Sequence, residues 1–145
     1  MSRDDQPQTI AVAGGGPVGA TAALSLASRG YRVTLVDRQR PMPGPSGLGM
    51  DVRNVALSPS SAGLLRGVNA WPEQAAAYDK MRVWEERGTS HLDFDAASVN
   101  RSELGWLVEV APLLDRLWQQ LDREPNVTVV LGSISGVQPG NDSVR

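Results

Sequence analysis

Residues 9–38, TIAVAGGGPVGATAALSLASRGYRVTLVDR, constrain the fold of this chain more than any other stretch. Thr9–Ala13 is a short apolar run of the kind that forms a strand buried on both faces. Glycines follow at once, and Pro17 suits the first turn of a helix that continues to Arg29. Residues 31–36 form a second apolar run. The order strand, helix, strand predicts the right-handed crossover unit of a parallel sheet.

Gly14, Gly16 and Gly19 have the spacing G-x-G-x-x-G within this unit. In a dinucleotide-binding domain the first glycine permits the tight turn, the second lets the backbone approach a pyrophosphate, and the third lets the helix pack close to the strand. The helix N-terminus offers N–H groups to the phosphates, and Asp37, at the end of the second run, can accept hydrogen bonds from a ribose. Glycines that serve only the turn are the alternative, but the strand, helix and acid together favour nucleotide binding.

The rest of the chain predicts shorter elements around a third strand in the sequence NVTVVLG. They are, in chain order, a loop over 41–50, a short segment over 52–57, a helix capped by Ser58 and begun by Pro59, a second helix over 72–78, an antiparallel pair of 81–86 with 91–95, a helix over 110–123, and pairing of ISGVQ with chain that begins at Val144. We therefore expect an α/β protein, a parallel sheet with crossover helices plus a small antiparallel insertion.

Composition excludes several classes of function. The sequence has no cysteine, which excludes thiolate nucleophiles, zinc-thiolate sites and the redox disulfide of flavin-disulfide reductases. A formal net charge of -2 gives no electrostatic case for a nucleic-acid partner. No apolar stretch approaches the roughly 20 residues of a membrane span. We expect a disordered segment over residues 1–8, no secretory signal, and a cytoplasmic location.

The other polar and aromatic side chains are predicted to be structural. His91 is expected to be exposed to solvent, and Asp93 and Asp95 to share a solvated strand face with Phe94 turned inward. The alternative for the two acids is acid–base chemistry or a metal site. The four tryptophans are expected to pack in the core or between elements: Trp71, Trp84, Trp106 and Trp118.

Beyond these patterns, the sequence resembles the flavin-dependent aromatic hydroxylases, most closely the 2-polyprenylphenol hydroxylase family that acts on ubiquinone precursors. The stretches that carry the resemblance are IAVAGGGPVGATAALSLASRGYRVTLVDR, DVRNVALSPSSAGLLRGVNAW, YDKMRVWEERGTSHLDFDA and LGWLVEVAPLLDRLWQQL. The first is common to many FAD proteins, whereas the second and third, in this order, are more specific. The resemblance covers nearly all of residues 9–145.

The resemblance implies a Rossmann-like FAD-binding domain that is incomplete, since the rest of that domain and the substrate sheet would lie beyond residue 145. It implies that the whole protein hydroxylates an aromatic quinone precursor with FAD, NAD(P)H and dioxygen. No catalytic side chain and no metal ligand are expected, because the flavin carries the chemistry. Implied associations are with a membrane surface or sister enzymes, and the isolated stretch is expected to bind FAD weakly and to self-associate.

By this resemblance the glycine turn would hold the FAD pyrophosphate, through Gly14, Gly15, Gly16, Pro17, Val18 and Gly19. Asp37 would bind the ribose, Arg38 would lie by the adenosine, and Arg53 would lie on the flavin side of the cofactor. An ordinary surface arginine is the alternative for Arg53. Family members commonly carry Asn, Gln or Arg where this chain has Val110, so a side-chain contact with the cofactor is lost or replaced there.

Two other functions stay open at this point. One is a nicotinamide-dependent dehydrogenase, which the roughly 90 residues between Asp37 and the third strand disfavour, because a simple NAD domain reaches its third strand sooner. The other is a catalytically inactive nucleotide-binding module that retains the first half of the fold.

Overall fold

The computed structural model describes residues 8–42, 49–86 and 88–140. The expected loop over 41–50 falls largely outside these residues. The expected disordered segment over residues 1–8, except Gln8, and the expected pairing at Val144 also lie outside them. The chain divides into two compact units, one formed by residues 1–42 and 117–145 and the other by residues 43–116. We call them the glycine-turn unit and the insertion unit and describe each by itself.

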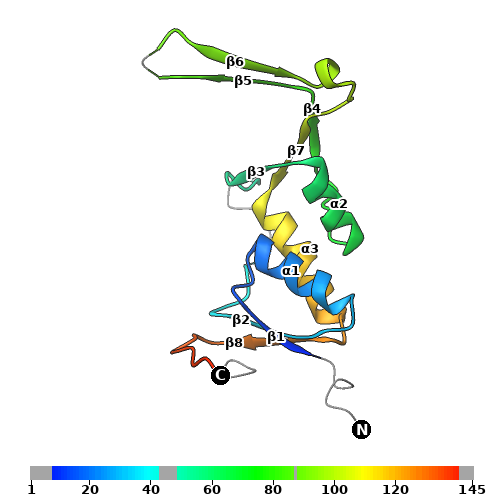
Figure 1. The fold of residues 1–145 in the computed structure, drawn as a ribbon, viewed down its shortest axis with the longest axis vertical. Coiled ribbons are helices and arrows are strands. Elements are labelled where there is room, and N and C mark those ends of the chain that lie inside the picture. Colours follow the sequence, from blue (N-terminus) through cyan, green and yellow to red (C-terminus); the bar gives the residue numbers. More distant parts are fainter. Residues whose placement is uncertain (1–7, 43–48, 87, 141–145) are drawn as a thin grey trace. The chain divides into compact units, whose positions relative to one another are not determined.

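The glycine-turn unit is built on the predicted parallel sheet. Its strands are β1 (Thr9–Ala13), β2 (Arg32–Asp37) and β8 (Val127–Leu131), in the order β1-β2-β8. Helix α1 (Pro17–Ala27) connects β1 to β2 and packs on both strands (Figure 1). The register pairs Ala13 with Val36 and Asp37 with Leu131, so the carboxyl ends of all three strands meet at one edge. This confirms the predicted crossover unit and its third strand.

Small and branched apolar side chains form the core of this unit. On α1 the buried positions are mostly alanines, which let the helix lie close to the sheet, and on β2 Val33 and Leu35 are fully covered. The second half of α3 (Val110–Arg123) adds Leu117, Trp118 and Leu121, all at most 4% exposed. The apolar positions of α3 recur at helical spacing, as the sequence predicts.

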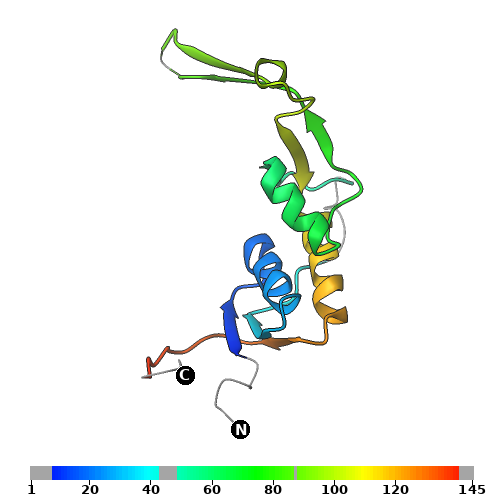
Figure 2. The same cartoon turned by 45° about the vertical axis from the view of Figure 1, so that its right-hand side comes forward.

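The insertion unit begins with β3 (Asn54–Leu57) and α2 (Pro59–Gly67). Ser58 caps α2 as predicted, with its Oγ accepting from the N–H of Ser61 at 3.2 Å. β3 lies in an antiparallel sheet of order β3-β7-β4, where β7 is Gly105–Glu109 and β4 is Ala76–Tyr78 (Figure 2). A 3-10 helix, η2 (Ala96–Val99), precedes β7.

The predicted helix over residues 72–78 is wrong. Residues 76–78 form β4 and pair with the central strand β7, with Ala77 opposite Trp106. The alanines in this stretch have high helix propensity, but propensity is a weak prior that tertiary pairing overrides. Here β7 supplies the backbone partner, with Tyr78 opposite Gly105, and the Leu104 N–H just before β7 donates to the Tyr78 carbonyl at 2.8 Å.

The antiparallel pair outside the main sheet is confirmed as β5 (Lys80–Trp84) and β6 (His91–Asp95). Ion pairs join one face of this hairpin, Arg82 to Asp93 at 2.5 Å and Lys80 to Asp95 at 3.3 Å, so the solvated acidic face is also confirmed. Two expectations are wrong: Phe94 is 43% exposed rather than turned inward, and Trp84 is 71% exposed. Phe94 lies on the face opposite the ion pairs, and the described part of the chain leaves this face largely uncovered, since its apolar side chains Met81, Val83, Leu92 and Phe94 are 41–64% exposed. Trp84 lies on the ion-paired face.

Helices in the described part of the chain are short or amphipathic, and none of them is long and apolar enough to cross a membrane.

Candidate functional site: the glycine turn and the strand ends beside it

The turn after β1 is shaped by two glycines that no other residue could replace without strain. Gly14 has φ +96°, a conformation that side chains rarely adopt, and its N–H donates to the Val36 carbonyl at 2.8 Å. A Cβ on Gly19 would collide with the carbonyl oxygen of Gly14. The turn and the first turn of α1 therefore lie in direct backbone contact, as expected for the first and third glycines of the motif.

The middle of the motif faces open space. Gly16 is the N-cap of α1, it is exposed, and a Cβ built on it meets no heavy atom within 4 Å. Pro17 follows at the first helical position, and no acidic residue lies in the first turn. The unpaired N–H groups and the positive end of the helix dipole thus face a region that an anion can enter. Val18, 84% exposed, lies in the same turn.

Asp37 points at this turn from the end of β2. Its Oδ2 accepts a hydrogen bond from the Gly15 N–H at 2.5 Å, and its Oδ1 accepts from the Gln39 N–H at 3.3 Å. The Gly15 hydrogen bond is the main reason that the pKa of Asp37 lies below its ordinary value. The carboxylate is therefore ionised at neutral pH and held beside the turn.

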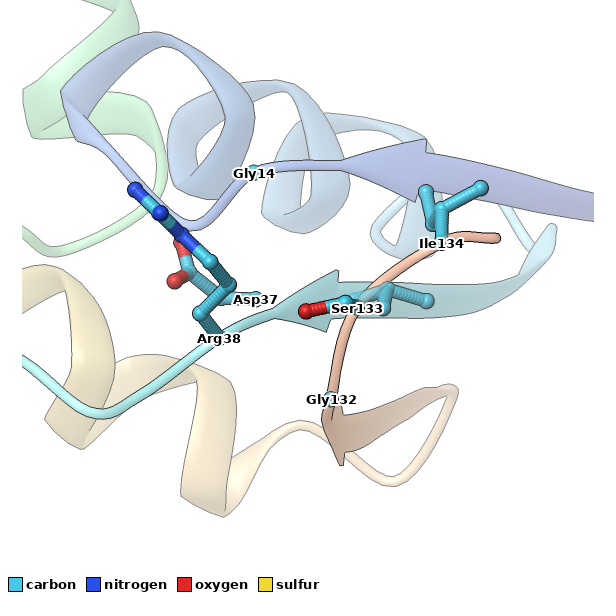
Figure 3. Close-up of a pocket in the computed structure, with 7 residues that line it drawn as sticks. Gly14, Asp37, Arg38, Gly132, Ser133 and Ile134 are labelled. Carbon is cyan, nitrogen blue, oxygen red and sulfur yellow. The ribbon is translucent and has the colours of Figure 1, made fainter. Parts of the chain in front are cut away.

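A shallow pocket of about 360 Å³ lies between the turn and the ends of β2 and β8 (Figure 3). Its lining residues are Gly14, Val36, Asp37, Arg38, Gly132, Ser133 and Ile134. Ligand sites of small molecules span about 300–1,000 Å³, so this volume suits one portion of a dinucleotide rather than all of it. Sequence reasoning missed residues 132–134. Their signal was their place directly after a parallel strand, because ligands bind at the carboxyl ends of such strands.

Gly15 is held from both sides. While its N–H donates to Asp37, its carbonyl accepts from the indole Nε1 of Trp118 at 2.8 Å. The indole also closes the space above the glycine, since a Cβ on Gly15 would lie 2.5 Å from Cζ2 of Trp118. The expected core position of Trp118 is confirmed by its 4% exposure, but its hydrogen bond to the turn was not predicted.

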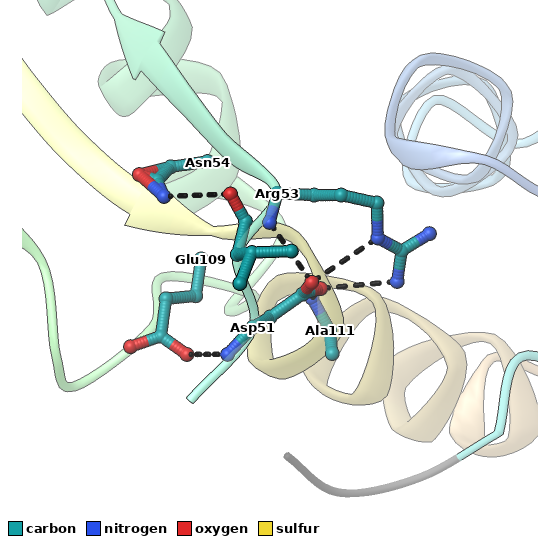
Figure 4. A network of polar contacts seen from close by, with 6 residues as sticks. Asp51, Arg53, Asn54, Glu109 and Ala111 are labelled. Carbon is teal, nitrogen blue, oxygen red and sulfur yellow. Dashed lines mark hydrogen bonds and ion pairs between the residues drawn. The ribbon is translucent and has the colours of Figure 1, made fainter. Parts of the chain in front are cut away.

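A second polar cluster lies in the insertion unit, around the buried carboxylate of Asp51 (Figure 4). Asp51 accepts from the Ala111 N–H at 2.9 Å, in the first turn of α3, and from the Arg53 N–H at 3.0 Å. The guanidinium of Arg53 adds two hydrogen bonds, at 3.1 and 3.0 Å, which are the main reason that the pKa of Asp51 is lowered. The Asp51 N–H in turn donates to a carboxylate oxygen of Glu109 at 2.7 Å.

The arginine of this cluster is exposed to solvent, although the aspartate that holds it is buried. The Arg53 side chain is 68% exposed, although its orientation is set by Asp51. Val110 begins α3, and its N–H donates to the Arg53 carbonyl at 3.0 Å. Arg53 belongs to the insertion unit and the glycine turn to the other unit. Its predicted place on the flavin side of a cofactor therefore stays a prediction.

The histidine and carboxylate side chains of the described ranges are the remaining candidates for a metal site or for acid–base chemistry. Among those residues no group of three or more His, Asp or Glu side chains could hold a metal ion. His91 is exposed as expected, with its side chain 53% accessible and its Nε2 3.5 Å from a carboxylate oxygen of Asp93. Trp71 and Trp106 are packing groups as expected, since their rings meet edge to face at 5.6 Å.

Known proteins are similar to this chain in sequence and in fold. The model of the family described as FAD dependent oxidoreductase matches residues 9–138. The 3-demethoxyubiquinol 3-hydroxylase of Escherichia coli (strain K12) is 38% identical over 143 residues, which are 95% of this chain and 36% of that protein. A tRNA 5-methylaminomethyl-2-thiouridine biosynthesis bifunctional protein of Thiobacillus denitrificans is 35% identical over 114 residues, 72% of this chain and 18% of its own length. The chain thus spans about a third or less of these relatives.

Solved structures agree on the fold. A p-nitrophenol 4-monooxygenase from Pseudomonas putida DLL-E4 has a TM-score of 0.65 at 23% identity, covering 95% of this chain and 35% of that one. A Diels-Alderase of pyrroindomycin biosynthesis has a TM-score of 0.67 at 20% identity, covering 94% and 28%. Two such different reactions on one fold mean that the architecture alone does not identify the reaction.

Proposed function

The chain belongs to the FAD dependent oxidoreductase family, and from that premise we propose that it is the FAD-binding portion of a flavin monooxygenase. The reaction we propose for the whole protein is hydroxylation of an aromatic ring in a ubiquinone precursor, with NAD(P)H as reductant and dioxygen as oxidant. The proposal rests on the 38% identity to 3-demethoxyubiquinol 3-hydroxylase, which extends over 95% of the chain.

FAD is the cofactor of this family, and the glycine-turn unit fits it. The structural observation that supports FAD binding is the open middle of the turn, where Gly16 has no heavy atom within 4 Å of a built Cβ. A side chain there would fill the space that a diphosphate needs, whereas Gly15 and Gly19 are closed by neighbouring atoms. The open backbone at Gly16, next to the helix N-terminus and Asp37, supports a nucleotide-binding role for the motif.

The residues of this unit would bind and orient the cofactor without reacting themselves. The N–H groups of Gly16 and of the first turn of α1 would hold the diphosphate. The Asp37 carboxylate, ionised and fixed beside the turn, would accept hydrogen bonds from the ribose. Arg38 lines the pocket next to it and would lie by the adenosine. Bound FAD supplies electron transfer and oxygen activation.

Arg53 is proposed to lie on the flavin side, with Asp51 setting its direction. Two hydrogen bonds between the side chains and one from the Arg53 backbone hold the pair as one unit. An exposed guanidinium fixed in this way can approach a negatively charged group without first being ordered. The test of this placement is a loss of FAD affinity in Arg53→Gln.

The experiment that tests the proposed function uses the full-length protein. Purified protein is examined for bound flavin by its visible absorbance, and then for NADH and NADPH oxidation with and without a demethoxyubiquinol. We expect bound FAD, reductant oxidation that increases with the quinol, and a product that has gained one oxygen atom. Asp37→Asn serves as a variant with weakened cofactor binding, and Arg82→Gln on the exposed hairpin as the control with unchanged binding.

Two results would contradict the proposal. Protein that binds a nicotinamide nucleotide but no flavin would indicate the dehydrogenase alternative. Protein that binds FAD and oxidises reductant but leaves every quinol unchanged would keep the flavoenzyme and reject the substrate class.

A further inference from the structure

The structure assigns a positioning role to Trp118: its indole N–H sets the direction of the Gly16 N–H, and thereby the diphosphate affinity of the turn. This inference rests on the proposed nucleotide-binding function of the turn, and it adds a residue that is far from the motif in sequence. The observation behind it is a 2.8 Å hydrogen bond from the Trp118 Nε1 to the Gly15 carbonyl.

The argument begins with the geometry of one peptide group. The Gly15 carbonyl and the Gly16 N–H belong to the same planar trans peptide, so they point in opposite directions. A donor that holds the carbonyl on the Trp118 side therefore directs the Gly16 N–H away from that side. Gly16 is exposed and faces open space, whereas Gly15 is buried. The indole thus selects the peptide orientation that an anion can use.

Three consecutive glycines make such a restraint necessary. Glycine populates positive and negative φ almost equally, so a peptide between two glycines can rotate at little cost. Without a partner for the Gly15 carbonyl, the Gly16 N–H would sample several directions before a diphosphate arrived. Ordering it would then reduce affinity, because a ligand that binds only a fraction of conformers binds more weakly.

Asp37 restrains the other side of Gly15, so the N–H groups of Gly15 and Gly16 have different roles. The Gly15 N–H is already donated to the Asp37 carboxylate at 2.5 Å. That N–H is therefore committed, and the carboxylate repels an anion placed directly upon it. Among the three consecutive glycines, Gly14 donates its N–H to Val36 and Gly15 to Asp37, which leaves the Gly16 N–H, directed by Trp118, for an anion.

The indole is itself held in place. Arg40, just beyond the end of β2, lies with its guanidinium 5.2 Å from the centroid of the Trp118 ring. The same guanidinium makes two hydrogen bonds, at 2.9 and 2.6 Å, to Asp122, which lies one helical turn after Trp118 on α3. Helix α3, the chain after β2 and the glycine turn therefore form one connected set of contacts within the glycine-turn unit.

The test removes the indole N–H while keeping its size. In the full-length protein, the indole of Trp118 is replaced by benzothiophene, in which sulfur takes the place of N–H. Affinities are measured for FAD, for ADP as a diphosphate probe, and for adenosine, which has no phosphate. We expect FAD and ADP to bind about 5-fold more weakly, the effect of one neutral hydrogen bond, and adenosine to bind as before. The same replacement at Trp84, 71% exposed, is the matched control.

A second measurement needs no substitution. If the bond from Trp118 favours ADP binding, ADP must favour the bond by the same factor, because coupling between two equilibria is reciprocal. The indole N–H of Trp118 should therefore exchange with solvent about 5-fold more slowly when ADP is bound. This measurement keeps the inference testable even if the substituted protein does not fold.

The outcomes separate the inference from the proposed function. Three results would each overturn the role of Trp118. The benzothiophene variant could bind ADP as tightly as the unsubstituted protein, or it could lose as much affinity for adenosine as for ADP. The exchange rate of the Trp118 indole N–H could also be the same with and without ADP. Unsubstituted protein that binds ADP but not FAD would reject the proposed flavoenzyme. The role of Trp118 would then still be decided by the ratio of the ADP affinities of the benzothiophene variant and the unsubstituted protein.

Discussion

Replacing Gly19 by alanine sets two physical effects against each other in one helix. Alanine is better than glycine in a helix interior by about 1 kcal/mol, so propensity alone predicts a more stable protein. The structure predicts the opposite, because a Cβ on Gly19 would lie closer to the carbonyl oxygen of Gly14 than the 3.0 Å below which real Cβ contacts essentially never fall. The obstacle is backbone and cannot rotate away as a side chain can.

The size of the effect follows from these two terms. Inserting a methyl group into a closed contact costs about 1–3 kcal/mol, and a backbone obstacle places this case at the upper end. Subtracting about 1 kcal/mol of helix propensity leaves a destabilisation of about 2 kcal/mol. The turn must also move away from α1, which displaces the Gly16 N–H, so FAD affinity should fall by at least about 10-fold.

Gly63 provides the matched control. It lies within α2, is exposed, and a Cβ on it would meet no heavy atom within 4 Å. Gly63→Ala should therefore raise the free energy of unfolding by about 0.5–1 kcal/mol through propensity alone and leave FAD binding unchanged. The assay is denaturant unfolding of both variants in the full-length protein, with FAD titration. Equal stability gains for Gly19→Ala and Gly63→Ala would refute the close contact and the argument built on it.

The further predictions concern three variants of charged groups. Asp37→Asn should weaken FAD binding by about 10-fold or more, measured by titration, because a charge-assisted acceptor is lost. Folding lowers the pKa of Asp37, so its carboxylate stabilises the folded protein above the unfolded pKa of about 3.9, and this stabilisation is lost as the pH falls through the lower folded pKa. The free energy of unfolding of Asp37→Asn should therefore fall less with decreasing pH in this range than that of the parent. Asp51→Ala should lower the free energy of unfolding and speed amide exchange at the start of α3, because the Ala111 N–H loses its acceptor and the Arg53 guanidinium its hydrogen-bond partner. An unchanged exchange rate of the Ala111 amide would contradict this prediction. Arg82→Gln should leave the urea midpoint unchanged, since its ion pair is exposed to solvent, and a clear shift would show that the hairpin depends on it.

The sequence by itself determined the unit from β1 to β2 and the cap of α2. The strand bounds at Thr9–Ala13, the start of α1 at Pro17 and the cap at Ser58 all agree with prediction. Each depends on residues that are close together in the chain, where apolar periodicity, glycine conformation and capping act directly. The same local signals placed Asp37 at the end of its strand, within reach of the turn.

Tertiary structure alone decided the contacts between distant segments. Residues 76–78 became a strand because β7 was there to pair with them, although their composition favours a helix. The loop after β8 joined the pocket because β8 is parallel to β2, and the indole of Trp118 reached Gly15 across 103 residues of sequence. Periodicity reports which side of an element is apolar but not what that side meets, so a hydrogen bond between elements far apart in sequence appears only once the chain has folded.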